Sequence, residues 1–394
     1  MKSFRTVLFW MHLACGAVAG LVILVMSVTG VALMYEKQTV EWADRRAWTA
    51  PSSTGQPLSP ETLLALVVAG RPEAAPTGIT MRADAAAPAT VALEGNKTLL
   101  VDPYSGRIIG EPQAQPRAFF RLMTTWHRYL ALEGASRATG RALTGAANLI
   151  FLFVVLSGTY LWVPRVWSAI QFRNVLWFRS GLASKARDFN WHNVIGIWSA
   201  MPLVIIVAAA LPMSYPWANN LAYRLVGEAP PAPPQGGGPA QARGGERSER
   251  ASAPMVTSGL AAAWSAARSG HPKWRTMTTR LSPSPKAPVV ITVDDGYGGQ
   301  PQLRATVSVD RATAEVTKTE TFKDLSVGRQ FRSWLRFAHT GEYYGLTGQT
   351  IAGLATAGGA VLVYTGIALA LRRFAAWMRR RSQSSSIEER QRAA

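Results

Sequence analysis

Four of the five histidines in this 394-residue chain lie within or just before long apolar runs. His12 lies one turn into the first run and His192 opens the third, whereas His127 and His339 precede the second and the fourth. An ionisable side chain at such a position is a candidate functional group, because burying it near a membrane is costly. A single histidine at a membrane interface is also an ordinary tolerated residue, but two pairs at matching depths favour a function.

Neutral imidazole is a good ligand for iron, zinc or copper. A zinc site would need further ligands, and no cysteine or carboxylate is arranged beside these four histidines. A six-coordinate haem iron needs only two axial ligands, because the porphyrin supplies four nitrogens. Two histidines on facing helices therefore suit a b-type haem, and the lack of a Cys-x-x-Cys-His motif excludes covalent c-type attachment. Membrane depth pairs His12 with His192 and His127 with His339, which gives two haems and an electron path across the membrane.

Small residues follow two of these histidines on the same helical face. Gly16 and Gly20 come after His12, and Gly196 comes after His192. Such residues allow close approach of a flat macrocycle or, equally, of a neighbouring helix. They are compatible with haem binding and do not establish it.

The elements that must position these histidines are membrane spans. Hydrophobic residues make up 48% of the chain and charged residues 16%. Four apolar runs, at residues 7–35, 143–163, 194–214 and 350–371, are long enough to cross a bilayer, which takes roughly 20 helical residues. The first run is too long for a secretory signal core and no small-residue cleavage site follows it, so we expect a retained anchor.

Basic residues predict the orientation of the spans. Lys2 and Arg5 precede the first span, basic residues fill the short segment between spans two and three, and arginines follow span four. All three segments then lie on one side, so we expect an inner-membrane protein with both termini in the cytoplasm. The long segments 36–142 and 215–349 face outward. Much of the net charge of +19 is therefore a topology signal, and we expect no nucleic-acid partner.

Each outward segment has the pattern of a small α+β unit. In the first, "SPETLLALVVAG" predicts a helix with Ser59 as its N-cap, and "ATVALEGNKTLLVDPYSGRIIGE" predicts paired strands. In the second, "SGLAAAWSAARSG" predicts the helix, and "APVVITVDD" and "LRATVSVDRATAEVTKTE" predict the strands. The pieces "LLVDPYSGRIIGE" and "VSVDRATAEVTKTE" align as the same hairpin, which indicates an internal repeat.

The chain resembles the PepSY-associated transmembrane proteins, a family that includes bacterial inner-membrane siderophore reductases. The resemblance rests on "FWMHLACGAVAGLVILVMSVTGVALMYE", "LMTTWHRYLALEG" with "FLFVVLSGTYLWVPR", "FNWHNVIGIWSAMPL" and "LRFAHTGEYYGLTGQTIAGLA", which occur in this order over nearly the whole chain. It implies an integral membrane α-helical bundle of four transmembrane helices with two periplasmic α+β PepSY-like units. It also implies that His12, His127, His192 and His339 are the axial ligands of haem iron. The Pro/Gly/Arg-rich stretch 228–254 does not match the family pattern.

The resulting division of the chain has four spans, two PepSY-like units and their connections. The spans with their flanking segments are 1–36, 119–165 with an interfacial helix, 191–215, and 326–373 with a second interfacial helix. The PepSY-like units are 37–118 and 257–325. The connections are a cytoplasmic basic loop at 166–190, a flexible linker at 216–256 and a cytoplasmic basic tail at 374–394, of which the linker and the tail are expected to be unstructured.

The function implied is that of a di-haem b ferric-siderophore reductase, an oxidoreductase acting on metal ions, which releases ferrous iron in the periplasm. Because no Gly-x-Gly-x-x-Gly lies between a strand and a helix, electrons would come from quinol or a cytoplasmic donor. Other expected partners are membrane lipid and periplasmic iron-binding or transport proteins. Two alternatives stay open: a haem-dependent reductase of flavin or free metal, and a non-enzymatic PepSY-type envelope regulator or sensor. A transporter is disfavoured because the spans show no pair of broken helices.

Overall fold

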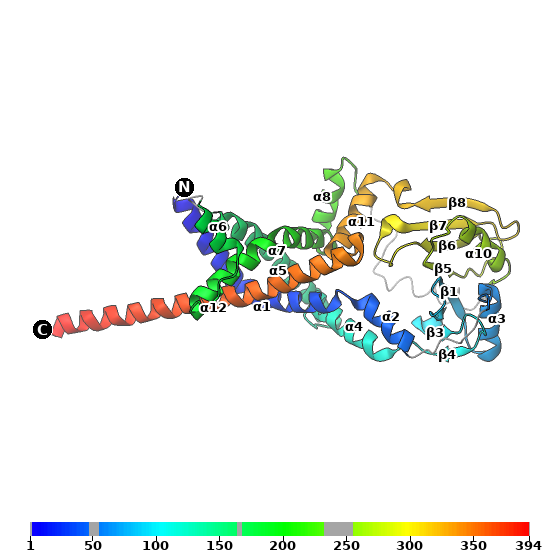
Figure 1. Cartoon of the computed structure of the whole chain (residues 1–394), viewed down its shortest axis with the longest axis horizontal. Helices are drawn as coiled ribbons and strands as arrows, with labels where there is room; N and C mark the ends of the chain where they lie inside the picture. Colours follow the sequence, from blue (N-terminus) through cyan, green and yellow to red (C-terminus); the bar gives the residue numbers. More distant parts are fainter. Residues whose placement is uncertain (1, 47–54, 164–167, 232–254, 394) are drawn as a thin grey trace. The chain divides into compact units, whose positions relative to one another are not determined.

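The computed structural model describes residues 2–46, 55–163, 168–231 and 255–393 (Figure 1). The chain divides into two compact units. The helical unit contains Met1–Tyr35, Phe120–Asn219 and Leu335–Ala394. The sheet unit contains Glu36–Phe119 and Asn220–Trp334. Each unit is thus built from segments of both halves of the sequence.

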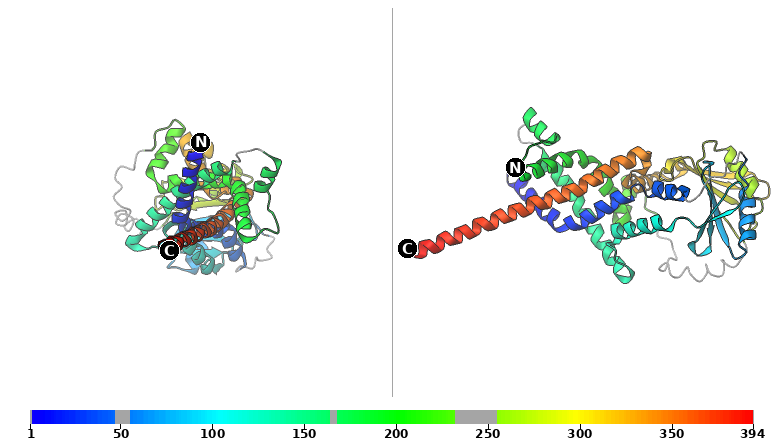
Figure 2. Two further views of the ribbon diagram at one scale, coloured as in Figure 1. Left: turned by 90° about the vertical axis from the view of Figure 1, so that its left-hand side faces the viewer. Right: turned by 60° about the horizontal axis from the view of Figure 1, so that its bottom comes forward.

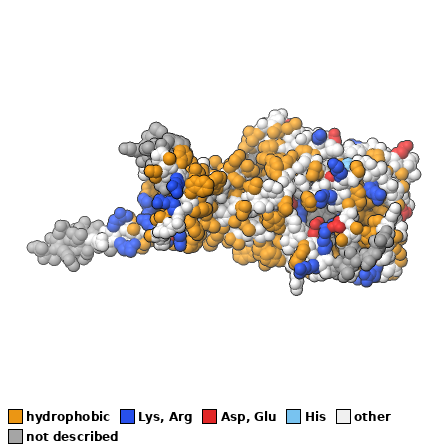
Figure 3. All heavy atoms as spheres, in the orientation of Figure 1, with side chains coloured by type: hydrophobic (Ala, Val, Ile, Leu, Met, Phe, Trp, Pro, Cys, Tyr) orange, Lys and Arg blue, Asp and Glu red, His pale blue; other side chains and the backbone are white. Residues whose placement is uncertain are grey.

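The helical unit is built on four long helices: α1 (Lys2–Leu33), α5 (Arg137–Trp162), α7 (Ser184–Ser214) and α12 (Gly345–Ala393). All four are long and apolar enough to cross a membrane, which confirms the predicted spans. Hydrophobic side chains cover the outside of these helices, and Lys and Arg gather at the end where α1 begins (Figure 3). The chain is therefore a membrane protein with four candidate spans.

Small and aliphatic residues hold the long helices together. Val155 of α5, Leu203 of α7 and Ala355 of α12 belong to one buried cluster, and Ala19 of α1 and Ala147 of α5 belong to a second. Polar contacts add to this packing. The buried Asp188 of α7 pairs with Arg372 of α12 at 2.7 Å, and the Asn148 amide of α5 donates to the Val207 carbonyl of α7 at 3.0 Å.

The chain also contains shorter helices. They are α2 (Glu36–Arg46), α4 (Ala114–Tyr129), α6 (Ala169–Leu176), α8 (Pro216–Leu225) and α11 (Val327–His339). Short 3-10 helices occur at Glu94–Asn96, Gly134–Ser136, Pro301–Leu303, Phe322–Asp324 and Glu342–Tyr344. Helices α4 and α11 match the interfacial helices expected before the second and fourth spans. Each ends at or just after a candidate histidine and turns back into the next span.

The sheet unit contains one sheet of eight strands in the order β4-β3-β2-β1-β5-β6-β7-β8. The strands are β1 (Pro76–Arg82), β2 (Ala89–Leu93), β3 (Thr98–Val101), β4 (Ile108–Gly110), β5 (Thr276–Arg280), β6 (Val289–Asp294), β7 (Arg304–Val309) and β8 (Val316–Thr321). This sheet is consistent with the expected α+β segments, but the segments share one continuous sheet. Strands β1 and β5, which the sequence analysis did not predict, pair antiparallel and join the two halves into one sheet.

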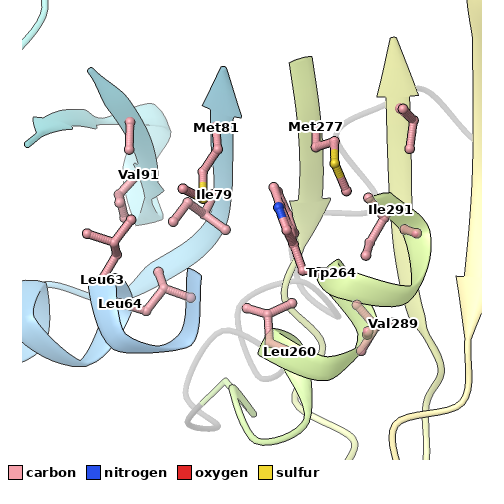
Figure 4. Close-up of a cluster of buried hydrophobic side chains, with 14 of the residues drawn as sticks. Leu63, Leu64, Ile79, Met81, Val91, Leu260, Trp264, Met277, Val289 and Ile291 are labelled. Carbon is pink, nitrogen blue, oxygen red and sulfur yellow. The ribbon is translucent and has the colours of Figure 1, made fainter. Parts of the chain in front are cut away.

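Two helices, α3 (Pro60–Gly70) and α10 (Leu260–Ser269), pack on one face of this sheet (Figure 4). Ser59 caps α3 as predicted, because its hydroxyl accepts from the Thr62 backbone N–H at 3.1 Å. The buried core contains side chains from both helices and from the strands of both halves, including Leu63, Ile79 and Leu260. A continuous core lies under the joined sheet.

The sheet repeats the same hairpin at its two edges, which confirms the predicted internal repeat. Hairpin β3–β4 closes one edge and β7–β8 closes the other. The Asp102 carboxylate accepts from the backbone N–H of Tyr104 at 2.9 Å, and the Asp310 carboxylate accepts from that of Ala312 at 2.9 Å. The same turn chemistry thus occurs in both halves.

Three connections differ from the sequence expectation. The segment 166–190 contains α6, and the predicted linker 216–256 begins with α8, where Ala218 and Ala222 are buried. The rest of that linker, at residues 232–254, lies outside the described residues. The tail 374–394 was expected to be unstructured, but α12 continues to Ala393 and runs past the other long helices (Figure 2). Its run of Arg, Ser, Glu and Gln contains no Pro or Gly to end the helix.

Candidate functional site

The helical unit brings the four candidate histidines together in the two predicted pairs. The ring centres of His12 on α1 and His192 on α7 are 6.5 Å apart. Those of His127 on α4 and His339 on α11 are 6.2 Å apart. All four residues are half-buried. The pairing that membrane depth predicted is therefore the pairing that the structure contains.

One nitrogen of each ring in the His12–His192 pair is held by the hydroxyl of a neighbouring helix. His12 Nδ1 is 3.0 Å from Ser157 Oγ on α5, and His192 Nδ1 is 2.9 Å from Thr365 Oγ1 on α12. Thr365 Oγ1 donates its own proton to the Val361 carbonyl at 2.8 Å, so it accepts from the imidazole. The ring nitrogen facing it must then carry the proton.

The His127–His339 pair is held mainly by backbone carbonyls, which can only accept hydrogen bonds. His127 Nδ1 is 2.9 Å from the Met26 carbonyl and 3.1 Å from Thr29 Oγ1, both on α1. His339 Nδ1 is 2.8 Å from the Ile206 carbonyl on α7. Both rings therefore carry their proton on Nδ1, which leaves the lone pair on Nε2. Among the described residues, no hydrogen bond to Nε2 is present in any of the four histidines.

Burial keeps the second pair in the neutral form that binds metals. It lowers the pKa of His127 to about 4, with a smaller effect of the neighbouring His339. Burial also lowers the pKa of His339. Both rings are therefore neutral at pH 7, and their lone pairs are available to a metal.

The helix segment that contacts each ring is here called its anchor segment. On α1, the Met26 carbonyl and the Thr29 hydroxyl contact the ring of His127, and a Cβ added to Gly30 would lie 3.3 Å from its Cε1. A carbonyl at position i, a hydroxyl at i+3 and a glycine at i+4 thus surround the ring. The glycine leaves room for the imidazole edge against the helix.

Two other anchor segments repeat this pattern. On α5 it consists of Val154, Ser157 and Gly158 around His12, and on α12 of Leu362, Thr365 and Gly366 around His192. A Cβ added to Gly158 would lie 3.1 Å from His12 Cε1, and one added to Gly366 would lie 3.4 Å from His192 Cε1. These residues were not predicted from the sequence. Their signal was a Ser-Gly or Thr-Gly pair in three of the four apolar runs.

The fourth anchor segment, on α7, keeps only the carbonyl. Ile206 supplies it, and the positions of the hydroxyl and the glycine hold Ala209 and Ala210. His339 therefore has one anchoring acceptor, where His127 has two.

Two further glycines fix the turns that carry the second pair. A Cβ on Gly140 of α5 would overlap the Tyr129 carbonyl just after His127, and one on Gly348 of α12 would overlap the Gly341 carbonyl just after His339. Each turn therefore packs directly on the start of the next span. This contact sets the position of the histidine before it.

The glycines that the sequence analysis noted have different surroundings. A Cβ on Gly20 would contact Ile367 of α12 at 3.2 Å, and one on Gly196 would lie 3.6 Å from Leu362, so both positions pack against a helix. The position beside Gly16, four residues after His12, is open. Only Gly16 is therefore placed where a macrocycle could approach.

The geometry of both pairs fits a six-coordinate haem. Two metal–nitrogen bonds of about 2.1 Å, with about 1.1 Å from each nitrogen to its ring centre, place two axial imidazoles roughly 6 Å apart. The observed separations of 6.5 and 6.2 Å match this distance. Within the described ranges, no group of three or more His, Cys, Asp or Glu is placed to hold a metal. A metal at either pair would take its other ligands from a cofactor.

The two pairs lie at different depths along the bundle. Thr29, which holds His127, comes 17 residues after His12 on the same helix. At about 1.5 Å per residue, the two sites are roughly 25 Å apart along α1, close to the thickness of a bilayer's hydrocarbon core.

Comparison with known families identifies the family of the chain. The family model of the PepSY-associated TM region matches residues 9–373, which include all four histidines and their anchor segments. The chain belongs to this family. No curated protein matches the chain. In this PepSY-associated protein the match extends over both units, so the sheet and the spans belong to one family architecture.

Proposed function

We propose that this protein is a di-haem b reductase of the bacterial inner membrane, with both termini in the cytoplasm. It passes electrons across the membrane, reduces ferric siderophore in the periplasm and releases ferrous iron. The observation that carries the proposal is the presence of two histidine pairs, each at the spacing of two axial ligands and roughly 25 Å apart along α1.

The residues of the chain would bind and orient the two haems. His12 with His192 would hold one, and His127 with His339 the other. Each ring would keep its proton on Nδ1, bonded to an anchor segment, and would leave Nε2 free to hold a haem. Such contacts fix the ring orientation and raise the basicity of the ligand. Haem supplies one-electron transfer at its iron when it is bound.

The substrate chemistry needs no acid or base from the protein. Adding one electron to a ferric chelate gives a ferrous chelate, which holds its iron far less tightly, so reduction releases the metal. The electron would come from quinol or a cytoplasmic donor. Released iron would pass to periplasmic iron-binding or transport proteins.

The test is reduction of ferric chelates by the full-length protein in liposomes. The haems are reduced with dithionite, excess reductant is removed, and a panel of ferric siderophores is added in the presence of a ferrous-iron indicator. We expect oxidation of the haems together with one ferrous ion per electron. The His339→Ala variant should lose this reaction, whereas His271→Ala, which changes a histidine of the sheet unit, should keep it.

Two outcomes would contradict the proposal. Reduced haems that stay reduced with every ferric chelate but are oxidised by flavin or free metal would indicate another acceptor. A protein without haem that tolerates His127→Ala and His339→Ala would indicate an envelope regulator or sensor.

A further inference from the structure

The sheet unit contains a cavity on the face of the sheet that α3 and α10 leave open. Met277 and Ile291 point into the core beneath these helices, so their neighbours Thr278 and Thr292 point to the other face. Both threonines line a cavity of about 1220 Å³, together with residues of α2 and of strands β1, β6 and β7. This volume exceeds that of a typical small-ligand pocket.

The lining of the cavity is strongly basic. Seven Lys and Arg side chains line it, against three carboxylates. Each carboxylate already has an arginine partner: Asp84 with Arg45 at 2.7 Å, Asp294 with Arg304 at 3.0 Å and Glu41 with Arg82 at 3.9 Å. Basic side chains thus outnumber the carboxylates of the lining, which gives the cavity a net positive charge.

Two of these basic residues, Lys273 and Arg275, come just before β5. They have no ion-pair partner within the described part of the chain. The Arg275 guanidinium lies 4.2 Å from the ring centre of Tyr297, which holds it in place. Lys37 Nζ lies beside Gly298 of the same loop. Arg275 and Lys37 thus lie beside the loop that contains Tyr297, and Lys273 lines the same cavity.

We propose that this cavity binds a small polyanion that carries neighbouring carboxylate or phosphate groups. Arg275 offers the planar fork that binds such oxyanions through two parallel hydrogen bonds, and the lysines add point charges. The threonine hydroxyls of the open face can donate to further oxygens. The site lies entirely within the sheet unit and requires no haem, so it does not depend on the proposed function.

The test is isothermal titration of the full-length protein in detergent with citrate and, separately, with pyrophosphate at low ionic strength. We expect saturable binding of citrate, of pyrophosphate or of both. The anion that binds more tightly shows whether the site prefers carboxylate or phosphate groups. The Lys273→Gln/Arg275→Gln variant should bind about tenfold or more weakly, because each charge-assisted hydrogen bond is a strong one. Binding should also weaken as salt is raised.

Arg268→Gln is the matched control, because Arg268 is an exposed arginine of α10 on the opposite side of the sheet. It should bind like the wild type. Circular dichroism should show the same fold in all variants, because the changed side chains are exposed. Titration of the single variant Lys273→Gln tests the site independently of the double variant. Absence of binding by both anions, or equal affinity in the wild type and the double variant, would overturn the proposal whatever the haem content.

Discussion

The two halves of the helical unit hold their histidines by the same plan but with different chemistry. In the first half, α1 presents Met26, Thr29 and Gly30 to His127. In the second half, α7 presents the Ile206 carbonyl to His339, and the two equivalent positions of the pattern hold Ala209 and Ala210. In both halves the carbonyl comes 14 residues after the histidine that its own helix carries, His12 on α1 and His192 on α7.

This difference distinguishes the contact that orients a ring from the contact that modifies its chemistry. The carbonyl is present in all four anchor segments. The His127–His339 rings are 6.2 Å apart, close to the 6.5 Å of the other pair, although the anchor segment of His339 has neither the hydroxyl nor the glycine. A carbonyl acceptor therefore suffices to orient the ring. Three of the four rings also contact a hydroxyl. This hydroxyl should affect the redox potential of a haem bound by the pair.

The largest expected effect comes from removing a ring. If the proposed function holds, His12→Ala and His127→Ala should each lower the haem content from two to one per chain, because each removes a histidine from a different pair. A pyridine haemochrome assay on the purified variants measures this. If either variant lost both haems, or neither, the two pairs would not be separate sites.

The next effect comes from filling the space beside a ring. In Gly158→Val the new side chain would press on His12, because even a Cβ lies 3.1 Å from its Cε1. Overpacking of this kind typically costs about 1–3 kcal/mol, so we expect about tenfold or more weaker haem retention at the His12–His192 pair. Competition with apomyoglobin measures the loss of haem.

Two variants sharpen this comparison. Gly359→Ala adds a methyl group whose nearest neighbours lie at 3.5 Å, so it should retain haem like the wild type. Ala210→Gly should also change little, because it removes a Cβ and so creates no clash with His339. Equal haem loss in Gly158→Val and Gly359→Ala would mean that the glycine serves general helix packing.

The third effect is the pH dependence of haem uptake by the His127–His339 pair. A protonated imidazole cannot ligate iron, and burial lowers the pKa of His127 to about 4. The neutral form of His127 therefore dominates above that value. Uptake of haem by the haem-free protein should stay constant from about pH 8 to pH 5 and fall as the pH drops through about 4. A fall centred near pH 6.5, the ordinary value for histidine, would contradict burial of the ring.

The smallest effect should come from the hydroxyl. A hydroxyl that accepts from Nδ1 makes the imidazole a stronger donor and favours ferric iron. Ala209→Ser should therefore lower the midpoint potential of the haem at the His127–His339 pair, and Thr29→Ala should raise it. Each shift should be about 20–60 mV, the equivalent of one net hydrogen bond.

Spectroscopic redox titration measures both shifts. Ala208→Ser, which adds a hydroxyl one residue away on α7, is the control and should leave the potential unchanged. Shifts in the same direction for Ala209→Ser and Thr29→Ala would show that the hydroxyl does not act through the ring.

Part of this architecture could be predicted from the sequence. The spans, the caps and the edge hairpins are encoded locally by apolar runs and turn residues, and the four histidines are conspicuous because ionisable groups are rare in such runs. Strands β1 and β5 were missed because their sequences, "PTGITMR" and "TMTTR", alternate weakly, and their pairing with each other joins segments about 200 residues apart. The anchor segments were missed because Ser, Thr and Gly are common in membrane helices. A Thr-Gly pair can therefore be recognised as part of an anchor segment only when the histidine that it contacts is known.

The most direct test of the central claim is the haem content of the purified wild-type protein. The protein is prepared in mild detergent from cells that make haem, its oxidised and dithionite-reduced optical spectra are recorded, and haem is counted as the pyridine haemochrome. We predict two b haems per chain with the bands of six-coordinate, low-spin iron. One haem would mean that only one histidine pair binds the cofactor, and a protein without haem would contradict the account.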